Sequence, residues 1–337
     1  MGETYAEVVT KYVQGTRLIV VASPGEQRRK RLAEKYGVRA CSSCDELLAI
    51  KDVDAVFIAT PHAHHAEDAL RCAKAGKHLM IDKPMACSVE ACDAILEACE
   101  ARKLKCSVMF THRARAGNAK AKEIIDSGRL GRVIHLRSYQ LVPGGMEIVP
   151  KWQQLPENIG LLFGHGIHNL DAARWFTGQE ITRVFAKSRN LGPAYPVEGT
   201  SDVLLVLADG TVCYIFCSFE VPNPGFPRSG IGARIVCERG LLDIDAYGET
   251  RMSCDGKGWE TVATQEPIDW AGQGFLDPVR LQAYVANVQA FIDAVQGRRS
   301  LPIDGWDGRQ AVAAALAAYE SSRTNKEIVL AESRRTK

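Results

Sequence analysis

The chain has 337 residues, of which 46% are hydrophobic and 24% charged, and its formal net charge is only +2. Because a domain usually has about 100 to 200 residues, two domains fit this length better than one small module. The ordinary composition and small net charge give no support to nucleic acid or a membrane surface as a partner. No uncharged apolar run reaches the roughly 18 to 20 residues of a membrane-spanning helix, and the N-terminal residues lack the apolar core of a secretory signal. We therefore expect a cytoplasmic protein.

The first part of the chain alternates β-branched runs with helical patterns. Strands are predicted at residues 17–22, 53–61, 77–84 and 104–110, and helices at 26–37, 64–77 and 88–103. Ser88 is the expected N-cap of the last of these helices. Strands and helices that alternate in this way are typical of right-handed crossovers, so residues 1–110 are predicted to form a Rossmann-type α/β domain with a parallel, doubly wound sheet.

From about residue 130 the pattern changes to closely spaced strands. These are predicted at residues 133–141, 181–189, 201–209, 211–220, 233–240 and 241–247, with helical patterns at 168–176, 282–297 and 307–322. Turn residues at Asp209-Gly210 and Arg239-Gly240 indicate antiparallel hairpins. Residues 111–330 are therefore predicted to form an α+β domain with a large, mainly antiparallel open sheet, and the last helices should pack on this sheet or on the first domain.

The 11 cysteines are scattered through these patterns. In a reducing cytosol, those within helix-like and strand-like patterns are expected to behave as small buried hydrophobic residues: Cys72, Cys92, Cys99, Cys106, Cys213, Cys217 and Cys237. Cys41 and Cys44 form a Cys-x-x-Cys pair, but no second pair lies at the spacing of a zinc site. A structural role is therefore favoured over metal binding, and no metal is expected.

Unusual residues stand after three of the strands predicted in the first domain. They are Ser23, Thr60-Pro61 and Asp82-Lys83-Pro84. Ligands bind outside the carboxyl ends of the strands in an open α/β sheet, so these residues indicate a ligand site. Burial of Lys83 beside a cationic cofactor ring would suit a proton donor, although an exposed loop lysine accounts equally well for the residues alone.

An ordered set of motifs extends over nearly the whole chain. It consists of Ala59-Thr60-Pro61-His62-Ala63-His64-His65, Ala75-Gly76-Lys77-His78, Asp82-Lys83-Pro84, Arg113, Ile124-Ile125-Asp126-Ser127-Gly128, Trp152 and Gly166-Ile167-His168-Asn169-Leu170-Asp171. Each motif is weak by itself, but their common order argues against chance. The set resembles the Gfo/Idh/MocA oxidoreductase family.

This resemblance implies NAD(P)-dependent hydride transfer between nicotinamide and a carbinol or carbonyl of a sugar, cyclitol or related hydroxy compound. It also implies a homodimer or homotetramer formed through the sheet of the second domain. Lys83 matches the family's lysine that orients cofactor and substrate, with Asp82 in place of a glutamate. His168 matches the catalytic histidine and would act as the general base. Without the resemblance, His168 would be read as a satisfied histidine at a helix start.

Further binding residues follow from the resemblance. The cofactor is expected to contact Gly2, Ser23, Arg28, Thr60, Pro61, His65, Asp82, Lys83 and Pro84, and the substrate to contact Arg113, Trp152, His165 and His168. NAD enzymes commonly place an acid after the second strand, whereas Ser23, with Arg28, Arg29 and Lys30 nearby, favours NADP over NAD. A solvated helix face is the alternative explanation of this basic run.

The chain departs from the family pattern in three places. It has neither the central strand nor the Gly-x-Gly-x-x-Gly loop of a Rossmann domain, and Gly2 takes the place of the third glycine. We expect a start assigned too late or a shortened chain, in which the two strands beside the missing one lack a partner. Gly164 replaces an aspartate often found four residues before the histidine, and a three-glycine stretch is reduced to Asn158-Ile159-Gly160. His165 is either a substitute substrate partner or a structural turn residue.

Two functions of different classes fit these residues. In an oxidoreductase, Lys83 would hold the reacting oxygen and His168 would accept its proton, so the two are expected to meet across one cleft. A non-catalytic sensor or scaffold that binds a nucleotide or sugar is the alternative, favoured by the absent glycine loop and by Gly164. A hydrolase that uses NAD transiently is a more distant third. The presence of both Lys83 and His168 favours the oxidoreductase.

Overall fold

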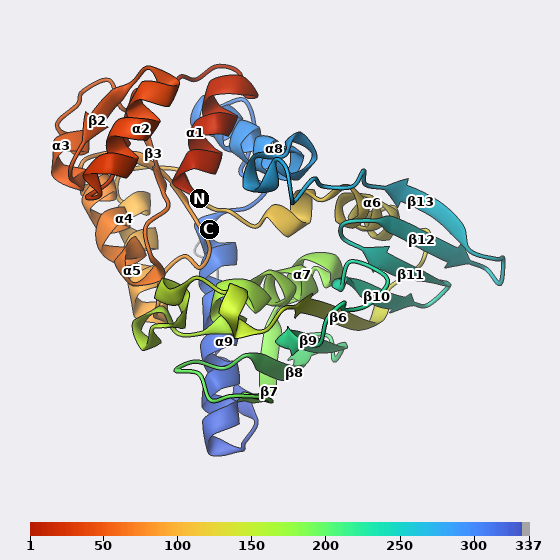
Figure 1. Ribbon diagram of the computed structural model, residues 1–337. Helices are drawn as coiled ribbons and strands as arrows, with labels where there is room; N and C mark the ends of the chain where they lie inside the picture. The colour runs from red at the N-terminus through yellow and green to blue at the C-terminus, as the bar shows by residue number, and fades with distance from the viewer. Residues whose placement is uncertain (332–337) are drawn as a thin grey trace. The chain divides into compact units, whose positions relative to one another are not determined.

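The computed structural model describes residues 1–331, and the chain divides into two compact units (Figure 1). The first unit comprises Met1–Met109 and Asp269–Arg309, and the second comprises Phe110–Ile268 and the described part of Gln310–Lys337. The division after Met109 lies next to the expected boundary, whereas residues 269–309 belong to the first unit and not to the second. No helix in the described part of the chain is both long and apolar enough to cross a membrane.

The first unit alternates helices with short parallel strands, which confirms the predicted Rossmann-type organisation. Its helices are α1 (Gly2–Lys11), α2 (Glu26–Tyr36), α3 (Cys44–Leu48), α4 (His65–Lys74), α5 (Val89–Glu100) and α8 (Pro278–Val295). Its strands are β1 (Val20–Ala22), β2 (Arg39–Cys41), β3 (Ala55–Ile58), β4 (His78–Ile81) and β5 (Cys106–Val108). Ser88 caps α5 as predicted, because its hydroxyl accepts a hydrogen bond of 3.1 Å from the Ala91 amide.

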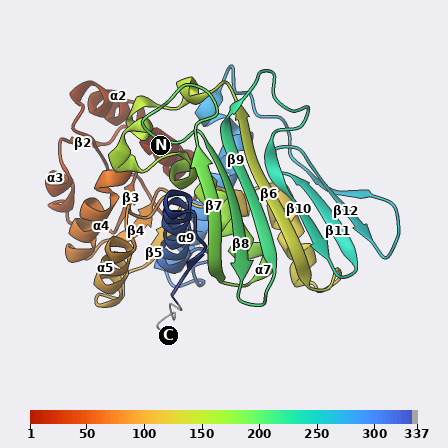
Figure 2. The ribbon, with the colours of Figure 1, turned by 90° about the horizontal axis from the view of Figure 1, so that it is seen from below.

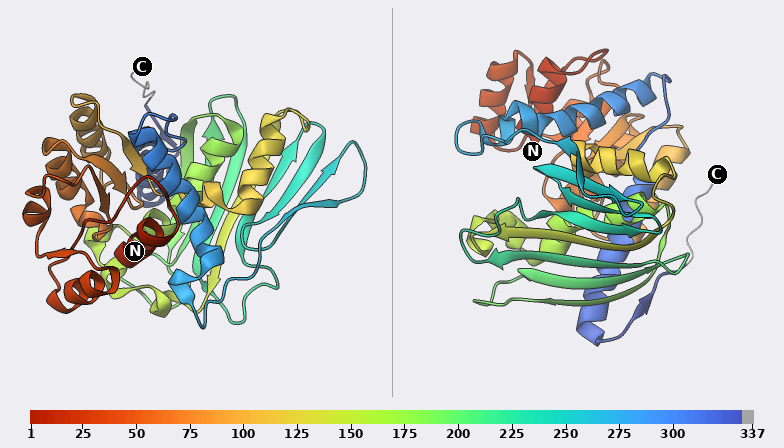
Figure 3. Two further views of the ribbon diagram at one scale, coloured as in Figure 1. Left: turned by 90° about the horizontal axis from the view of Figure 1, so that it is seen from above. Right: turned by 90° about the vertical axis from the view of Figure 1, so that its right-hand side faces the viewer.

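The parallel strands of this unit form two sheets. β1 pairs with β2 in one sheet, and β3, β4 and β5 form the other. Within residues 1–331, no strand joins β1 to β3. Apolar side chains of α1 and α8 pack with β4 in one core cluster of Tyr5, Val8, Val9, Met80, Met109, Leu281, Tyr284, Val288, Phe291 and Ile292. Figure 3 shows α1 beside α8, which explains why the late helix α8 belongs to this unit.

The second unit is built on a nine-stranded sheet. In spatial order its strands are β13 (Glu260–Thr264), β12 (Glu249–Cys254), β11 (Gly240–Asp245), β10 (Ile231–Cys237), β6 (Val133–Pro143), β9 (Val212–Val221), β8 (Thr200–Leu207), β7 (Ile181–Arg189) and β14 (Ile328–Val329). All neighbours are antiparallel except β6 and β9. The turns at Asp209-Gly210 and Arg239-Gly240 join antiparallel strands as predicted.

Helices cover one face of this sheet. The helix α6 (Ala116–Asp126) contacts β11, β12 and β13, and α7 (Ile167–Thr177) contacts β6 and β9. The helix α9 (Gly305–Thr324) begins in the first unit and continues into the second. Figure 2 shows the opposite face, where no helix of the described chain is drawn over β8, β9, β6 and β10. On β8, exposed Leu204 stands between buried Val203 and Leu205, so this strand has one buried and one open face.

The cysteines predicted to be small core residues are buried. They are Cys72, Cys92, Cys99, Cys106, Cys213, Cys217 and Cys237. Residues 1–331 contain no group of three or more His, Cys, Asp or Glu side chains that could hold a metal ion.

Candidate functional site

In the first unit, the residues expected to contact the cofactor follow the carboxyl ends of strands. Ser23 follows β1, Thr60 and Pro61 follow β3, and Asp82 follows β4. Because β3 and β4 are parallel neighbours, the loops after them leave the same edge of the sheet. This is the edge at which open α/β sheets bind their ligands.

The buried ring of His65 joins the loops that follow β3 and β4. Its Nε2 lies 2.8 Å from the carbonyl oxygen of Thr60, and its Nδ1 lies 2.7 Å from that of Pro84. The Thr60 hydroxyl in turn donates a hydrogen bond of 2.8 Å to Asp68. His65 therefore holds the backbone of both loops, and its expected contact with the cofactor stays a prediction.

Lys83 stands between buried Asp82 and a proline. The Asp82 carboxylate accepts a hydrogen bond of 2.9 Å from the Lys83 amide. Burial lowers the pKa of the Lys83 ammonium group; Asp82 opposes this shift, and Arg280 adds to it. The interaction with Arg280 was not predictable from the sequence, because Arg280 lies on the late helix α8 and belongs to no motif.

A second buried group near Asp82 also escaped the sequence analysis. Burial raises the pKa of the Tyr5 hydroxyl, and Asp82 raises it further. Arg280 donates a hydrogen bond of 2.7 Å to the hydroxyl of Tyr284, which packs with Tyr5 in the same core cluster. The edge of the sheet at Asp82 is thus surrounded by buried polar groups from α1 and α8.

The N-terminus of α1 has features that fit a phosphate group. The helix begins at Gly2, and Met1 forms no side-chain cap for its first turn. A Cβ atom added to Gly2 would meet no atom within 4 Å, so the space beside this residue is open. Amide groups at a helix N-terminus favour an anion through their hydrogens and the helix dipole. These features fit the pyrophosphate of a dinucleotide.

The basic run after Ser23 has mostly local partners. Arg29 donates hydrogen bonds of 2.9 Å to the carbonyl oxygen of Ser23 and 3.2 Å to that of Pro24. Lys30 forms an exposed ion pair of 2.6 Å with Glu26 on the same helix. Arg28 lowers the pKa of the Met1 amino group, an effect secondary to burial, so it acts near the start of α1. Of the three basic residues, Arg28 is therefore the best placed for a phosphate.

In the second unit, His168 lies in the first turn of α7, just after the π-helical turn Leu162–Gly166. Its imidazole stacks on that of His112, with ring centroids 4.1 Å apart and planes inclined by 15°. The ring of Phe110 meets His168 edge to face at 5.9 Å. Both histidines are buried, with 7% of His168 and 8% of His112 exposed. The candidate base is thus enclosed by aromatic rings.

Arg113 and Asp171 form a two-pronged ion pair beside this stack. The Arg113 Nε and Nη2 atoms donate to the two Asp171 carboxylate oxygens at 2.8 and 2.5 Å. Only 9% and 1% of these side chains are exposed. This ion pair holds the Arg113 side chain against α7, which carries Asp171. The expected contact of Arg113 with substrate stays a prediction.

His165 and Trp152 lie in neighbouring segments. The His165 Nε2 atom is 2.9 Å from the side-chain oxygen of Gln153, the residue after Trp152. The His165 ring also packs on Phe219 at 4.8 Å. The Trp152 carbonyl accepts a hydrogen bond of 2.7 Å from Asn158. The structure therefore brings together the segments of two residues expected to contact substrate.

A buried carboxylate that the sequence analysis missed holds the start of the π-helical turn. Glu198 accepts hydrogen bonds of 2.8 Å from the Leu162 amide and 2.7 Å from the Tyr319 hydroxyl. A Cβ atom at Gly160, whose φ is +113°, would lie 2.1 Å from Glu198 Oε2, so this position requires glycine. Burial raises the pKa of Glu198 to about 7, although hydrogen bonds to its carboxylate oppose the shift.

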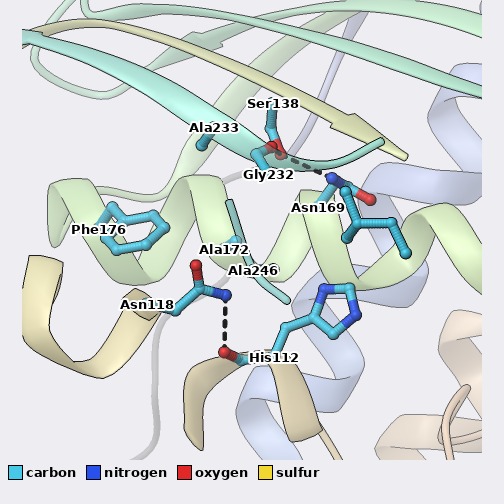
Figure 4. Close-up of a pocket in the computed structure, with 10 residues that line it drawn as sticks. His112, Asn118, Ser138, Asn169, Ala172, Phe176, Gly232, Ala233 and Ala246 are labelled. Atoms are coloured by element: carbon cyan, nitrogen blue, oxygen red, sulfur yellow. Dashed lines mark hydrogen bonds between the residues drawn. The ribbon is translucent and has the colours of Figure 1, made fainter. Parts of the chain in front are cut away.

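A small cavity with both polar and apolar lining residues lies beside His112 (Figure 4). Asn118 donates a hydrogen bond of 2.8 Å to the His112 carbonyl, and Asn169 donates one of 2.6 Å to the Ser138 hydroxyl. The buried Oδ1 atom of Asn169 has no hydrogen-bond partner among residues 1–331. The cavity volume of about 10 Å³ is room for one water molecule and excludes a sugar-sized substrate.

Lys83 and His168 belong to different compact units. The structure therefore brings Lys83 together with Asp82, and His168 together with His112. That Lys83 and His168 meet on one ligand stays a prediction.

Comparisons with known proteins agree with this organisation. Residues 1–110 match the oxidoreductase family with an NAD-binding Rossmann fold, and residues 118–243 match the GFO/IDH/MocA C-terminal domain. The chain is 29% identical to inositol 2-dehydrogenase 2 of Saccharopolyspora erythraea, over 96% of this chain and 91% of that protein. It is 26% identical to myo-inositol 2-dehydrogenase of Thermotoga maritima, over 98% and 96%. The crystal structure of scyllo-inositol dehydrogenase from Lactobacillus casei with NAD(H) and scyllo-inositol is similar, with a TM-score of 0.80, 26% identity and coverage of 97% and 95%.

Proposed function

The chain belongs to the Gfo/Idh/MocA family and is an NAD(P)-dependent oxidoreductase, and we propose that its substrate is a cyclitol or a closely related polyhydroxy compound. The similarity to inositol dehydrogenases over nearly the whole chain carries this proposal, because it includes both units. The aromatic enclosure of His168 supports it, since a confined imidazole can meet a hydroxyl group in a defined orientation.

In the proposed reaction, Lys83 holds the reacting hydroxyl oxygen and His168 accepts its proton while the hydride leaves the same carbon. When bound, the nicotinamide ring supplies the site that takes up the hydride. Because burial lowers the pKa of Lys83, its ammonium group shares a proton with the substrate oxygen more readily than an exposed lysine would.

The binding assignments form part of the same proposal. Gly2, Ser23, Arg28, Thr60, Pro61, His65, Asp82 and Pro84 contact the dinucleotide, and Arg113, Trp152 and His165 contact the substrate. NADP is preferred over NAD because Ser23 places no carboxylate at the ribose and Arg28 lies nearby. We also propose that the protein acts in the cytoplasm.

The open face of the large sheet joins two or more copies of the chain in this proposal. Phe185 and Leu204 are exposed and stand opposite each other on β7 and β8, and Tyr214 on β9 stands opposite Leu204. The exposed apolar side chains of this row, Phe185 and Leu204, favour a symmetric contact between sheets. Replacement of Leu204 by Asp should convert a dimer or tetramer to a smaller species in analytical ultracentrifugation. A wild-type chain that sediments as a monomer would contradict this assignment.

The substrate proposal is tested by following the absorbance of the reduced dinucleotide. We expect formation of NADPH or NADH with myo-inositol or scyllo-inositol, and loss of this activity in the His168→Ala variant. Glucose and glucuronic acid serve as comparison substrates. Oxidation of the sugars without oxidation of either inositol would overturn the cyclitol assignment but keep the reaction type.

A further inference from the structure

Two histidines of the second unit, His112 and His168, form a stacked pair. With centroids 4.1 Å apart and planes inclined by only 15°, the rings lie face to face in van der Waals contact. The His168 ring also makes an edge-to-face contact with the ring of Phe110. Rotation of the His168 ring about its side-chain bonds would drive it into one of these rings.

His112 is itself held in place by its backbone and by its neighbour. Asn118 donates a hydrogen bond of 2.8 Å to the His112 carbonyl. The next residue, Arg113, donates from Nε and Nη2 to the two carboxylate oxygens of Asp171. Asp171 lies about one helical turn after His168 on α7. Two consecutive residues, His112 and Arg113, thus contact two residues one turn apart on α7. The ion pair fixes the register in which the two imidazoles stack.

The residue four positions before His168 cannot orient its ring, because Gly164 has no side chain. The carboxylate of Asp171, three residues after His168 on α7, is bound by Arg113. The face of the His112 ring is a second means of holding the His168 imidazole in a fixed plane.

We propose that His112 is a positioning residue for His168: its ring fixes the plane in which the His168 imidazole meets the substrate hydroxyl. This inference rests on the proposed function, in which His168 accepts the hydroxyl proton. It predicts that a flat ring at position 112 is required, whereas the nitrogens of His112 are not.

The test compares two substitutions in the full chain. His112→Leu keeps a similar volume without a flat ring, and His112→Phe keeps the ring without the nitrogens. With NAD(P) and myo-inositol or scyllo-inositol, we expect His112→Leu to lower kcat by at least about tenfold, because a misplaced catalytic group loses rate steeply. KM for the dinucleotide should stay unchanged, and His112→Phe should restore most of kcat. If His112→Leu does not fold, His112→Gln serves as the ring-free variant.

Nuclear magnetic resonance of the His168 ring separates this inference from the proposed function. The stacked ring should shift the His168 ring protons upfield in the wild type and in His112→Phe, and this shift should disappear in the ring-free variant. Folded ring-free and wild-type chains with equal kcat, or a His112→Phe variant as slow as the ring-free one, would overturn the positioning role. Absence of activity in the wild type together with an upfield shift would overturn the proposed function, and absence of the shift would overturn the stack itself.

Discussion

Each unit uses a buried histidine to hold a segment of the candidate site, but the two histidines do so in different ways. His65 turns its ring nitrogens to the backbone carbonyls of Thr60 and Pro84. His112 turns its ring face to the imidazole of His168. The first arrangement fixes the course of two loops, and the second fixes the plane of one side chain. In the proposed function, the first arrangement would serve dinucleotide binding and the second would serve proton transfer.

This difference separates the expected effects of substitution. Changes at His65 should act on dinucleotide binding and stability, because loop backbones carry the binding groups. Substitutions at His168 or at residues that contact it should lower turnover, because His168 is the proposed acceptor of the hydroxyl proton. The predictions below test this separation.

The largest effect is expected for His168→Ala. Loss of the general base should lower kcat by about 10² to 10⁴, the usual range for an acid–base group. The dissociation constant of the dinucleotide, measured by calorimetric titration, should stay within about twofold of the wild type, since His168 lies outside the first unit. A loss of binding as large as the loss of turnover would break the proposed separation.

The reverse behaviour is expected for His65→Ala. The buried Pro84 carbonyl and the partly buried Thr60 carbonyl would lose their partner, at a cost of about 1 to 3 kcal/mol in the free energy of unfolding. The loops after β3 and β4 should then bind the dinucleotide more weakly, and saturating dinucleotide should restore most of kcat. Urea unfolding and calorimetric titration measure the two effects. His64→Ala is the matched control, because His64 is exposed on the same turn.

A smaller and more specific effect is expected for Ser23→Asp. A carboxylate after β1 would repel a 2′-phosphate and accept hydrogen bonds from ribose hydroxyls, so the preference should move from NADP toward NAD by about 1.5 to 3 kcal/mol. The ratio of kcat/KM values for the two dinucleotides measures this change, with Ser23→Ala as the uncharged control. An unchanged ratio in Ser23→Asp would assign the ribose contact to another loop.

The smallest effect is expected for Glu198→Gln, and it depends on pH. The pKa of Glu198 is raised to about 7 in the folded chain, above the unfolded value of 4.5. The folded state therefore binds more protons between these values, and stability falls as pH rises through this window. Glu198→Gln should unfold at higher urea than the wild type at pH ~8, by about 1 to 2 kcal/mol, with little difference at pH ~4.5. Equal stability of the two proteins at both pH values would contradict burial as the cause.

Much of the fold was predictable, because its longer elements have clear periodicity. The helices α4 and α5 fall within the predicted ranges, and α8 and the strands from β6 to β11 overlap theirs. The short elements β2 and α3 were missed, since three and five residues are too few to show a period. The return of α8 to the first unit depends on packing with α1, which no local pattern encodes.

The candidate site was predictable only where motifs carry it. Lys83 and His168 stand in motifs, whereas His112 matters through a stack on a residue of another helix. Glu198 meets Tyr319 across 121 positions of sequence, so neither residue reveals the other. The requirement for glycine at position 160 follows from the neighbouring Glu198 carboxylate, which the sequence does not place there. Contacts made by tertiary packing between distant residues leave no local signal.

The central claim is that Lys83 and His168 act on one substrate hydroxyl, and a crystal structure with bound dinucleotide and inositol tests it most directly. We expect the Nζ atom of Lys83 and one ring nitrogen of His168 both to lie about 2.6 to 3.2 Å from the same inositol oxygen, with His168 still stacked on His112. An inositol bound with these two groups on different oxygens, or with either group too distant for a hydrogen bond, would contradict the claim.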